Sequence, residues 1–553
     1  MEQARIGAYR LDRWVGSGGM GEVWRAVHVP FSAPVAIKLL TGARAARASQ
    51  RAAFRSEVRL AASLDHPGIV AIYDQGETEA DLGPIDARTP YVVMEWLGGS
   101  SLAHASLPGW DALDALLRGL LAALAHAHAK RVIHRDLKPA NLLLPARDGW
   151  GAVRIVDFGI AVLQGERADD DPDTSGTPAY MAPEQVRGAI GEQGPWTDLY
   201  ALGCVAWRLA TGRSVFDTGV RALTPVELLR AQLEDVPGRF EPRFDVPAGF
   251  EGWLRVLLNK RPSRRFACAA DAAGALAALG DVVARGAGAV GGAVDALLAD
   301  SGGTETFDFE AIDVLAIEPT PEPDLWQIRP RLPADWRPAV AGVGGVPAGG
   351  TGWFGPGLLG IRPHPLIGRE AERDRLWSAL RAVEAERAPR VIAIRGPTGA
   401  GKSRLGEWLV VRAREAGGIG LDVRHAAAVG REDGLVPMVL RQLGLGAEST
   451  DGTRESQDWL VRRISQLVRD PDDALVLAAL AAPRHVPGVE LREAERHAAL
   501  LALVRGLVDR RPTALVIDDA QWGNDALGFV RHLLAVGQDP VLAVVIVRDD
   551  AVG

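Results

Sequence analysis

Hydrophobic residues recur along the chain with two different spacings, and the spacing changes from one region to the next. From Tyr9 to Leu97, short apolar runs separated by turn residues predict strands, with one helical stretch over Arg47–Leu64. From Ser100 the spacing becomes helical, and Asp111–Arg131 predicts a long, buried amphipathic helix. We therefore expect a small β-rich lobe followed by a larger helical lobe.

The pattern fades over residues 280–363, which are rich in proline, glycine and alanine and predict a linker. Four aromatic residues there are candidates either for docking on a neighbouring domain or for a disordered role: Trp326, Trp336, Trp353 and Phe354. Apolar strands alternating with helices return over residues 364–553 and predict an α/β domain with a parallel sheet. Its clearest strands are Arg390–Ile394, Ala514–Asp519 and Val541–Val547.

Composition narrows the classes of protein. The chain has 553 residues, 47% hydrophobic and 24% charged, which is typical of a globular protein with several domains. A net charge of -8 gives no support for nucleic-acid binding. Two cysteines, no apolar leader after Met1 and no uninterrupted apolar run of membrane length favour a cytoplasmic protein.

The richest stretch for chemistry is His134–Asn141. Asp136 can accept the proton of an attacking hydroxyl, and Lys138 can neutralise a phosphoryl group during its transfer. Asn141 offers a side-chain oxygen to a magnesium ion. The stretch resembles the catalytic loop of protein kinases, in the form with lysine that is typical of Ser/Thr kinases.

The resemblance extends over about Tyr9–Leu279 and identifies this part as similar to bacterial Hanks-type serine/threonine protein kinases. Further motifs that carry it are Gly16–Gly21, Val35–Lys38, Asp157–Gly159 and Ala182–Glu184. It implies a bilobal α+β fold, with an N-lobe over 9–97 and a C-lobe over 98–279, and it implies ATP and Mg²⁺ as cofactors. The expected partners are proteins that present Ser or Thr.

The resemblance also implies residue roles. Lys38, paired with Glu57, would hold the ATP phosphates, and Asp157 with Asn141 would hold magnesium. Asp198 would brace the catalytic loop, and Arg265 would pair with Glu184. The expected nucleotide-binding residues are Val15, Gly16, Gly18, Gly21, Val23, Ala36, Lys38, Glu95, Leu97 and Leu143.

Arg135 precedes the catalytic aspartate, and kinases with that arginine commonly need a phosphate on the activation segment. Thr174 and Ser175 are the candidate phosphosites, because Thr177 matches a threonine with a structural role. The acidic run Asp169–Asp173 is the alternative, since it could supply a carboxylate to Arg135 without phosphorylation.

A second nucleotide motif, Gly396–Ser403, reads G-x-x-x-x-G-K-S between a strand and a helix, as a P-loop requires. Lys402 would reach the phosphates, and Ser403 and Asp518 would hold magnesium. The backbone amides that cradle the phosphates would come from the loop that contains Gly396, Gly399 and Gly401.

With the lead-in Gly368–Glu370, residues from about Pro365 to Asp549 resemble the STAND-type signalling ATPases of the AAA-like group. The resemblance adds Arg369 to the nucleotide site and makes Arg548 a candidate γ-phosphate sensor, although Arg548 also fits a surface arginine at a strand end. We expect a module truncated at its C-terminus. Asp519, where many hydrolytic enzymes have a glutamate, suggests slow turnover.

The expected protein is thus a Ser/Thr kinase in bacterial signal transduction, with ATP at two sites. Two alternatives remain open at this point: an inactive kinase-like scaffold beside a nucleotide switch, and a transcriptional regulator. Intact Lys38, Asp136 and Asp157 weigh against the first, and the negative net charge weighs against the second. The substrate, the upstream signal and the oligomeric state do not follow from the sequence.

Overall fold

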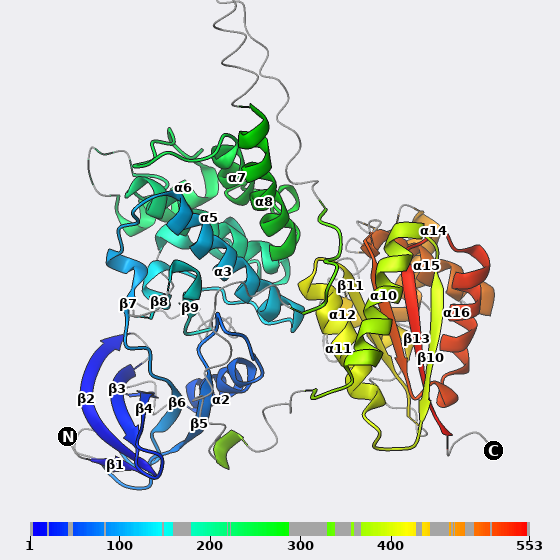
Figure 1. Ribbon diagram of the computed structural model, residues 1–553, viewed down its shortest axis with the longest axis horizontal. Helices are drawn as coiled ribbons and strands as arrows, with labels where there is room; N and C mark the ends of the chain where they lie inside the picture. The colour runs from blue at the N-terminus through cyan, green and yellow to red at the C-terminus, as the bar shows by residue number, and fades with distance from the viewer. Residues whose placement is uncertain are drawn as a thin grey trace, which may run out of the picture. The chain divides into compact units, whose positions relative to one another are not determined.

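The computed structural model describes residues 4–18, 21–41, 48–81, 85–145, 149–158, 178–217, 219, 221, 223–286, 329–337, 356–358, 366–426, 434–442, 464–465, 468, 470–481, 492–508 and 511–549. The chain divides into two compact units, residues 1–330 with 340–363 and residues 331–339 with 364–553 (Figure 1). Among the described residues, no helix combines the length and apolar character that a membrane crossing requires.

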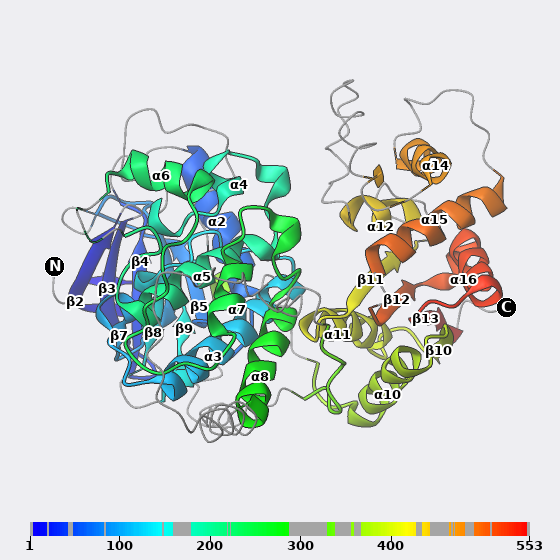
Figure 2. The same cartoon turned by 90° about the horizontal axis from the view of Figure 1, so that it is seen from above.

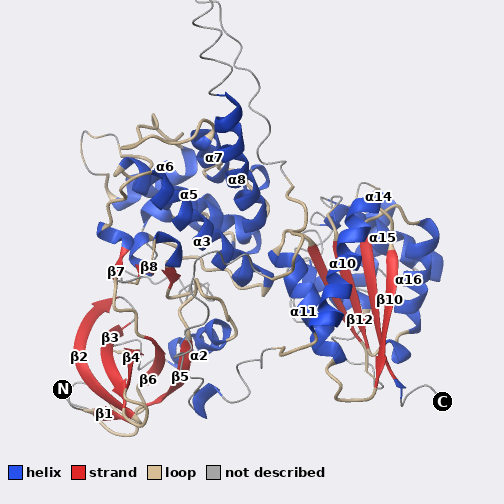
Figure 3. Ribbon diagram, in the orientation of Figure 1, coloured by secondary structure: helices blue, strands red, loops and turns tan. Residues whose placement is uncertain are grey.

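The first unit begins with an antiparallel sheet in the order β1-β2-β3-β4-β6-β5. The strands are β1 (Arg5–Ile6), β2 (Tyr9–Gly18), β3 (Gly21–His28), β4 (Ala33–Leu39), β5 (Ile72–Glu77) and β6 (Pro90–Glu95). Alternation decides which side chains are buried: Trp24, Ala26 and His28 of β3 point into the lobe. Helix α2 (Ala48–Ala62) packs against β5 and β6 (Figure 3).

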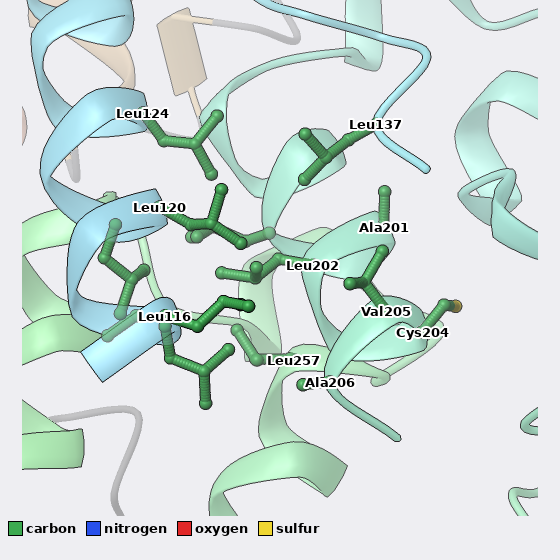
Figure 4. Packing of buried hydrophobic residues seen from close by; sticks show 14 of the residues in the cluster. Leu116, Leu120, Leu124, Leu137, Ala201, Leu202, Cys204, Val205, Ala206 and Leu257 are labelled. Carbon is green, nitrogen blue, oxygen red and sulfur yellow. The ribbon is translucent and has the colours of Figure 1, made fainter. Parts of the chain in front are cut away.

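A larger helical lobe follows, as the spacing predicted. Helix α3 (Trp110–Ala129) has leucines at 113, 116, 117, 120, 121 and 124 that are all buried, because residues three and four apart share one face. They pack against α5 (Pro195–Thr211) and α7 (Phe250–Leu257) (Figure 4). Gly203 of α5 allows α5 and α7 to approach closely, since a Cβ at this position would lie 2.9 Å from Leu257 Cβ of α7.

The remaining elements of this lobe are short, apart from α8. They are β7 (Ser100–Ser101), η1 (Leu102–His104), η2 (Pro139–Asn141), β8 (Leu142–Leu144), η3 (Trp150–Ala152), β9 (Arg154–Ile155), η4 (Pro178–Tyr180), α4 (Pro183–Val186), η5 (Ile190–Glu192), α6 (Pro225–Glu234), η6 (Pro262–Arg264) and α8 (Ala269–Gly286). A β-rich lobe and a helical lobe together confirm the expected bilobal α+β fold.

The second unit contains a parallel sheet in the order β10-β13-β12-β11. The strands are β10 (Arg390–Gly396), β11 (Ile419–Arg424), β12 (Thr513–Asp518) and β13 (Val541–Arg548). The helices and the short turn are α10 (Glu370–Glu386), α11 (Lys402–Glu415), α12 (Leu435–Gln442), α14 (Pro471–Ala481), α15 (Glu493–Val508), η9 (Ala520–Trp522) and α16 (Asn524–Val536).

Two hydrophobic cores lie on the two faces of this sheet. Val516 and Val544 face the core shared with α10 and α11, while Leu515 and Ala543 face the core shared with α14, α15 and α16 (Figure 2). Because successive residues of a strand point to opposite faces, a strand covered by helices on both sides must be apolar throughout. The uninterrupted apolar runs of β12 and β13 have this explanation, whereas β10 lies at the edge of the sheet and is more exposed. The expected α/β domain is confirmed.

Two described pieces of the predicted linker pack against the units. Trp336 is buried in the second unit, where its Nε1 donates to Asp374 Oδ1 at 2.7 Å, and Trp377 Nε1 donates to the carbonyl of Pro333 at 3.0 Å. The turn η8 (Pro356–Leu358) belongs to the first unit. Trp326, Trp353 and Phe354 lie outside the described residues. Trp336 therefore docks on a domain, one of the two roles left open for these aromatics.

Candidate active site and nucleotide site

The buried carboxylate of Asp198, in the first turn of α5, holds the backbone of the catalytic-loop stretch in place. Asp198 accepts hydrogen bonds from the backbone amides of His134 and Arg135, each at 2.8 Å, and lies 2.8 Å from His128 Nε2. Burial by itself raises the pKa of Asp198, but the hydrogen bonds and charges of His128 and His134 outweigh it and lower the pKa. A charged Asp198 thus stabilises the loop, and the bracing role expected of it is confirmed.

Three polar side chains converge within this loop. Asn141 Nδ2 donates to the backbone carbonyl of Asp136 at 2.8 Å and to its Oδ2 at 3.1 Å. Lys138 Nζ lies 2.8 Å from the same Oδ2. The loop also contains a left-handed backbone at Arg135, with φ of 65°. The Asp136 carboxylate is therefore held in one orientation by a cation and an amide.

Lys38 and Asp157 meet although 119 positions separate them in the chain. Lys38 Nζ donates to Asp157 Oδ1 at 2.7 Å, and Lys38 is itself 5% exposed. Burial raises the pKa of Asp157, but the charge and hydrogen bond of Lys38, together with the charges of His134 and Lys138, outweigh it and lower the pKa. Glu57 lies on α2, and its side chain is outside the described residues, as is Gly159.

The residues expected around the nucleotide lie on the facing strands of the first lobe and on β8. Gly16 pairs with Val23 and Gly18 with Gly21 across β2 and β3, while Val23 pairs with Lys38 across β3 and β4. Gly21 has φ of 130°, and a Cβ there would overlap the carbonyl oxygen of Leu39. The others are placed as follows: Val15 on β2, Ala36 on β4, Glu95 at the end of β6, Leu97 just after it, and Leu143 on β8.

The expected pairing of Arg265 with Glu184 is confirmed. Their side chains are fully buried and form two hydrogen bonds, of 2.8 and 3.0 Å, across 81 positions of the chain. Thr197 Oγ1 also donates to Glu184 Oε1 at 2.8 Å. Glu184 is the second residue of α4 (Pro183–Val186). The next residue, Gln185, donates its side-chain amide to the carbonyl of Arg135 at 2.7 Å. The buried pair thus fixes α4, and Gln185 connects α4 to the catalytic loop.

Gln185 is a contact that motif reasoning missed, because its position after the A-P-E motif carries no chemical signal.

The candidate phosphosites Thr174 and Ser175, together with Thr177, lie outside the described residues. Within the described part of the chain, Arg135 Nε is buried and has no hydrogen-bond partner. A buried guanidinium nitrogen without an acceptor fits a site that receives an anion from elsewhere.

In the second unit, β10 leads into the loop Gly396–Ser403, and α11 begins at Lys402. Gly399 and Gly401 both have φ of 81°, a left-handed conformation that glycine adopts without strain. Lys402 Nζ donates to the carbonyls of Gly396 and Pro397, each at 2.7 Å. Strand, glycine loop and helix N-terminus therefore form the phosphate-binding arrangement expected from the motif.

The residues expected near this loop are brought to its edge. Arg369 donates to the carbonyl of Ala400 at 2.9 Å. Arg548 pairs in register with Gly396 across β13 and β10, and its guanidinium donates to both carboxylate oxygens of Asp519, at 2.6 and 2.5 Å. Asp518 ends β12, and Ser403 lies in the first turn of α11. Arg548 is thus part of an ion pair and is not an isolated surface arginine.

Comparison with known proteins agrees with this geometry. Residues 9–273 match the protein kinase domain family, and residues 365–547 match the AAA ATPase domain family. This chain contains a protein kinase domain followed by an AAA ATPase domain.

The relatives of the kinase domain are bacterial serine/threonine-protein kinases. PknA of Mycobacterium tuberculosis is 35% identical over 283 residues, which cover 49% of this chain and 61% of PknA. PrkC of Bacillus subtilis is 35% identical over 271 residues, which cover 48% of this chain and 39% of PrkC. The chain therefore spans less than two thirds of the length of these curated relatives. The solved kinase domain of M. tuberculosis PknI is 27% identical, covers 51% of this chain and 99% of its own, and has a TM-score of 0.37.

Proposed function

We propose that this protein is a serine/threonine protein kinase of bacterial signal transduction, which transfers phosphate from ATP to Ser or Thr hydroxyls of other proteins. The observation that supports this most strongly is the cluster of Asp136, Lys138 and Asn141, in the same domain as the Lys38–Asp157 pair. Phosphoryl transfer depends mainly on positioning and charge neutralisation, and these five side chains supply both.

The residues present fit magnesium and ATP. Asp157 offers a carboxylate, and Asn141, whose amide nitrogen is used by Asp136, has its side-chain oxygen left to offer a hard cation. Magnesium bound there would neutralise charge on the phosphates. Lys38, on β4 of the β-rich lobe, is the cation suited to hold the ATP phosphates. We propose that Glu57 pairs with Lys38 in the active state.

In this proposal the chemistry of the protein itself rests on Asp136. Its carboxylate is oriented by Asn141 and Lys138, so that one oxygen can accept the proton of the attacking hydroxyl. Lys138 then compensates the negative charge that develops on the transferred group. The backbone of Glu95 and Leu97 would meet the adenine, and Leu143 would form the floor of its pocket.

We further propose that the AAA domain is a STAND-type nucleotide switch with ATP at its P-loop. Lys402 would bind the phosphates, and Ser403 and Asp518 would hold magnesium. The Arg548–Asp519 pair supports slow hydrolysis. Asp519 stands where many hydrolytic enzymes have a water-activating glutamate, and its carboxylate is already engaged by Arg548. A cytoplasmic location is supported by the cysteine content, which is only two residues, Cys204 and Cys268.

The kinase proposal is tested by incorporation of labelled phosphate from ATP into a generic protein substrate by the purified full chain. We expect Asp136→Asn to lower the rate by about 10²–10⁴-fold, the usual contribution of a general base, while ATP binding to the kinase domain is retained. Asp245→Asn, at an exposed aspartate of the same domain, is the matched control. A wild-type protein without transfer above that of Asp136→Asn would favour the inactive scaffold instead.

A further inference from the structure

A short piece of the predicted linker lies in an apolar groove of the kinase N-lobe. Leu358, in η8, is 3% exposed, so it is as buried as the core residues of the lobe itself. Its cluster combines the inner face of α2 with strands β4, β5 and β6. The buried members of that cluster are Ala36, Leu40, Phe54, Val58, Ala62, Val70, Ile72, Val92, Met94 and Leu358.

Backbone hydrogen bonds fix the segment in this groove. The amide of Gly357 donates to Asp74 Oδ1 at 2.9 Å, and Gln75 Nε2 donates to the carbonyl of Gly357 at 3.1 Å. Both partners belong to β5, more than 280 positions earlier in the chain. Leu358 is therefore held by a directional pair of contacts in addition to its apolar burial.

The acceptor in the groove is itself oriented by the lobe. Asp74 is 5% exposed, and its second oxygen accepts a hydrogen bond from the hydroxyl of Tyr9 at 2.9 Å. Burial, followed by the charge of Asp74, raises the pKa of Tyr9, so this hydroxyl keeps its proton and remains a donor. The Asp74 carboxylate is thus preorganised to receive one backbone amide from a docked segment.

The groove also selects for glycine at the position before the leucine. A Cβ on Gly357 would overlap the carbonyl oxygen of Gln75 and would lie 2.7 Å from Asp74 Oδ1. A side chain at this position would therefore force the segment away from β5, which carries both of its hydrogen-bond partners. The recognised element is therefore a Gly-Leu pair that supplies one apolar anchor and one backbone amide.

We propose that this groove is a peptide-binding site whose ligand is the chain's own segment 356–358, and that docking of Leu358 holds α2 in place and raises kinase activity. Phe54 and Val58 of α2 contribute to the same buried cluster as Leu358, so loss of the leucine leaves a void under the helix. The effect on activity rests on the proposed role of Glu57, which α2 carries. The docking itself does not depend on Glu57, and it is supported by the contacts of Gly357 and Leu358 alone.

The segment is also tied closely to the AAA domain. Eight positions separate Leu358 from Leu366, where the described part of that domain resumes. A chain of that length spans at most about 29 Å. The covalent connection alone therefore sets this upper limit on the distance between a docked Leu358 and Leu366.

Gly357→Ala in the full-length protein tests the proposal, with Gly238→Ala as the matched control, because a Cβ at Gly238 meets nothing within 4 Å. We expect backbone amides of Ala48–Ala62 to exchange hydrogen about tenfold faster in Gly357→Ala, the lower end of what one buried leucine is worth, with lower kinase activity. Gly238→Ala should match wild type in both measurements.

A synthetic peptide of residues 351–363, added to Gly357→Ala protein, should restore slow exchange of α2 and activity, whereas the same peptide with Leu358 replaced by Asp should not. This arm distinguishes release of the segment from misfolding. Exchange of α2 that is equal in Gly357→Ala and Gly238→Ala would overturn the docking. Faster exchange with unchanged activity would overturn the activating role, and a wild type without any transfer would instead refute the kinase proposal.

Discussion

Lys38 Nζ donates a 2.7 Å hydrogen bond to Asp157 Oδ1, so the strand lysine and the aspartate of the D-F-G motif form one ion pair in this conformation. Lys38 is almost fully buried, while the side chain of Asp157 is 35% exposed. Lys38 therefore helps to keep the Asp157 carboxylate charged, in addition to its own place in the candidate site.

Lys38→Met should abolish phosphate transfer and also change how stability depends on pH. In the wild type the pKa of Asp157 is lowered from 3.8, so its contribution is present above pH 3.8 and is lost as the pH falls through the lower folded-state value. Without Lys38, burial is the largest remaining effect on the Asp157 carboxyl, and the pKa of Asp157 should be higher than in the wild type. The difference in Tm between wild type and Lys38→Met should therefore narrow from pH 7 toward pH 4.

Thermal unfolding at a series of pH values measures this difference. Lys38→Arg keeps the cation and is the matched control, for which the Tm difference should stay nearly constant with pH. The coupling between the two residues would be refuted by a Lys38→Met difference that does not change over this range.

The buried pair of Arg265 and Glu184 should contribute to the stability of the helical lobe. Arg265→Ala leaves the Glu184 carboxylate buried without its cation, and we expect a loss of about 3–5 kcal/mol in the free energy of unfolding. Urea denaturation measures it. Arg230→Ala, which removes an exposed pair with Glu234, should change the free energy of unfolding far less, because water and salt screen an exposed pair. Equal effects of the two variants would contradict a structural role for the buried pair.

Phosphorylation of the activation segment should control activity through Arg135. Its Nε is buried and has no hydrogen-bond partner within the described residues, so a phosphate on Thr174 or Ser175 would satisfy it. We expect the double variant Thr174→Ala, Ser175→Ala to lose most activity and mass spectrometry to find phosphate at these positions in the wild type. Full activity of the double variant, without phosphate in the wild type, would favour the acidic run Asp169–Asp173 as the partner.

The two nucleotide sites should be separable. Lys402→Ala removes the lysine whose Nζ reaches over the P-loop carbonyls, and it should abolish nucleotide binding at the AAA domain alone. Calorimetric titration should count two sites in the wild type and one in Lys402→Ala, with kinase activity at least partly retained. Lys38→Met is the reciprocal control, since its remaining site should be the P-loop. A single site in the wild type would contradict the prediction.

Much of this protein follows from the sequence because its chemistry lies in contiguous stretches. His134–Asn141 carries three converging side chains within eight positions, and Gly396–Ser403 carries a complete phosphate loop. Local spacing also predicted helix α3 and the strands β10, β12 and β13 of the parallel sheet, since burial leaves a recognisable pattern of apolar positions. These features depend on neighbours in the chain, so no tertiary information is needed to recognise them.

Contacts between distant residues were decided by the tertiary structure. Nothing local indicates that Gly357 would donate to Asp74, that Trp336 would pack on the AAA domain, or that Arg548 would engage Asp519. Such contacts depend on where the folded chain brings each segment, and a proline- and glycine-rich composition describes a linker equally well whether or not it docks. The candidate catalytic residues could be read from motifs, whereas the attachment of the linker segment to the N-lobe depends on the folded positions of Leu358 and of the Asp74 carboxylate.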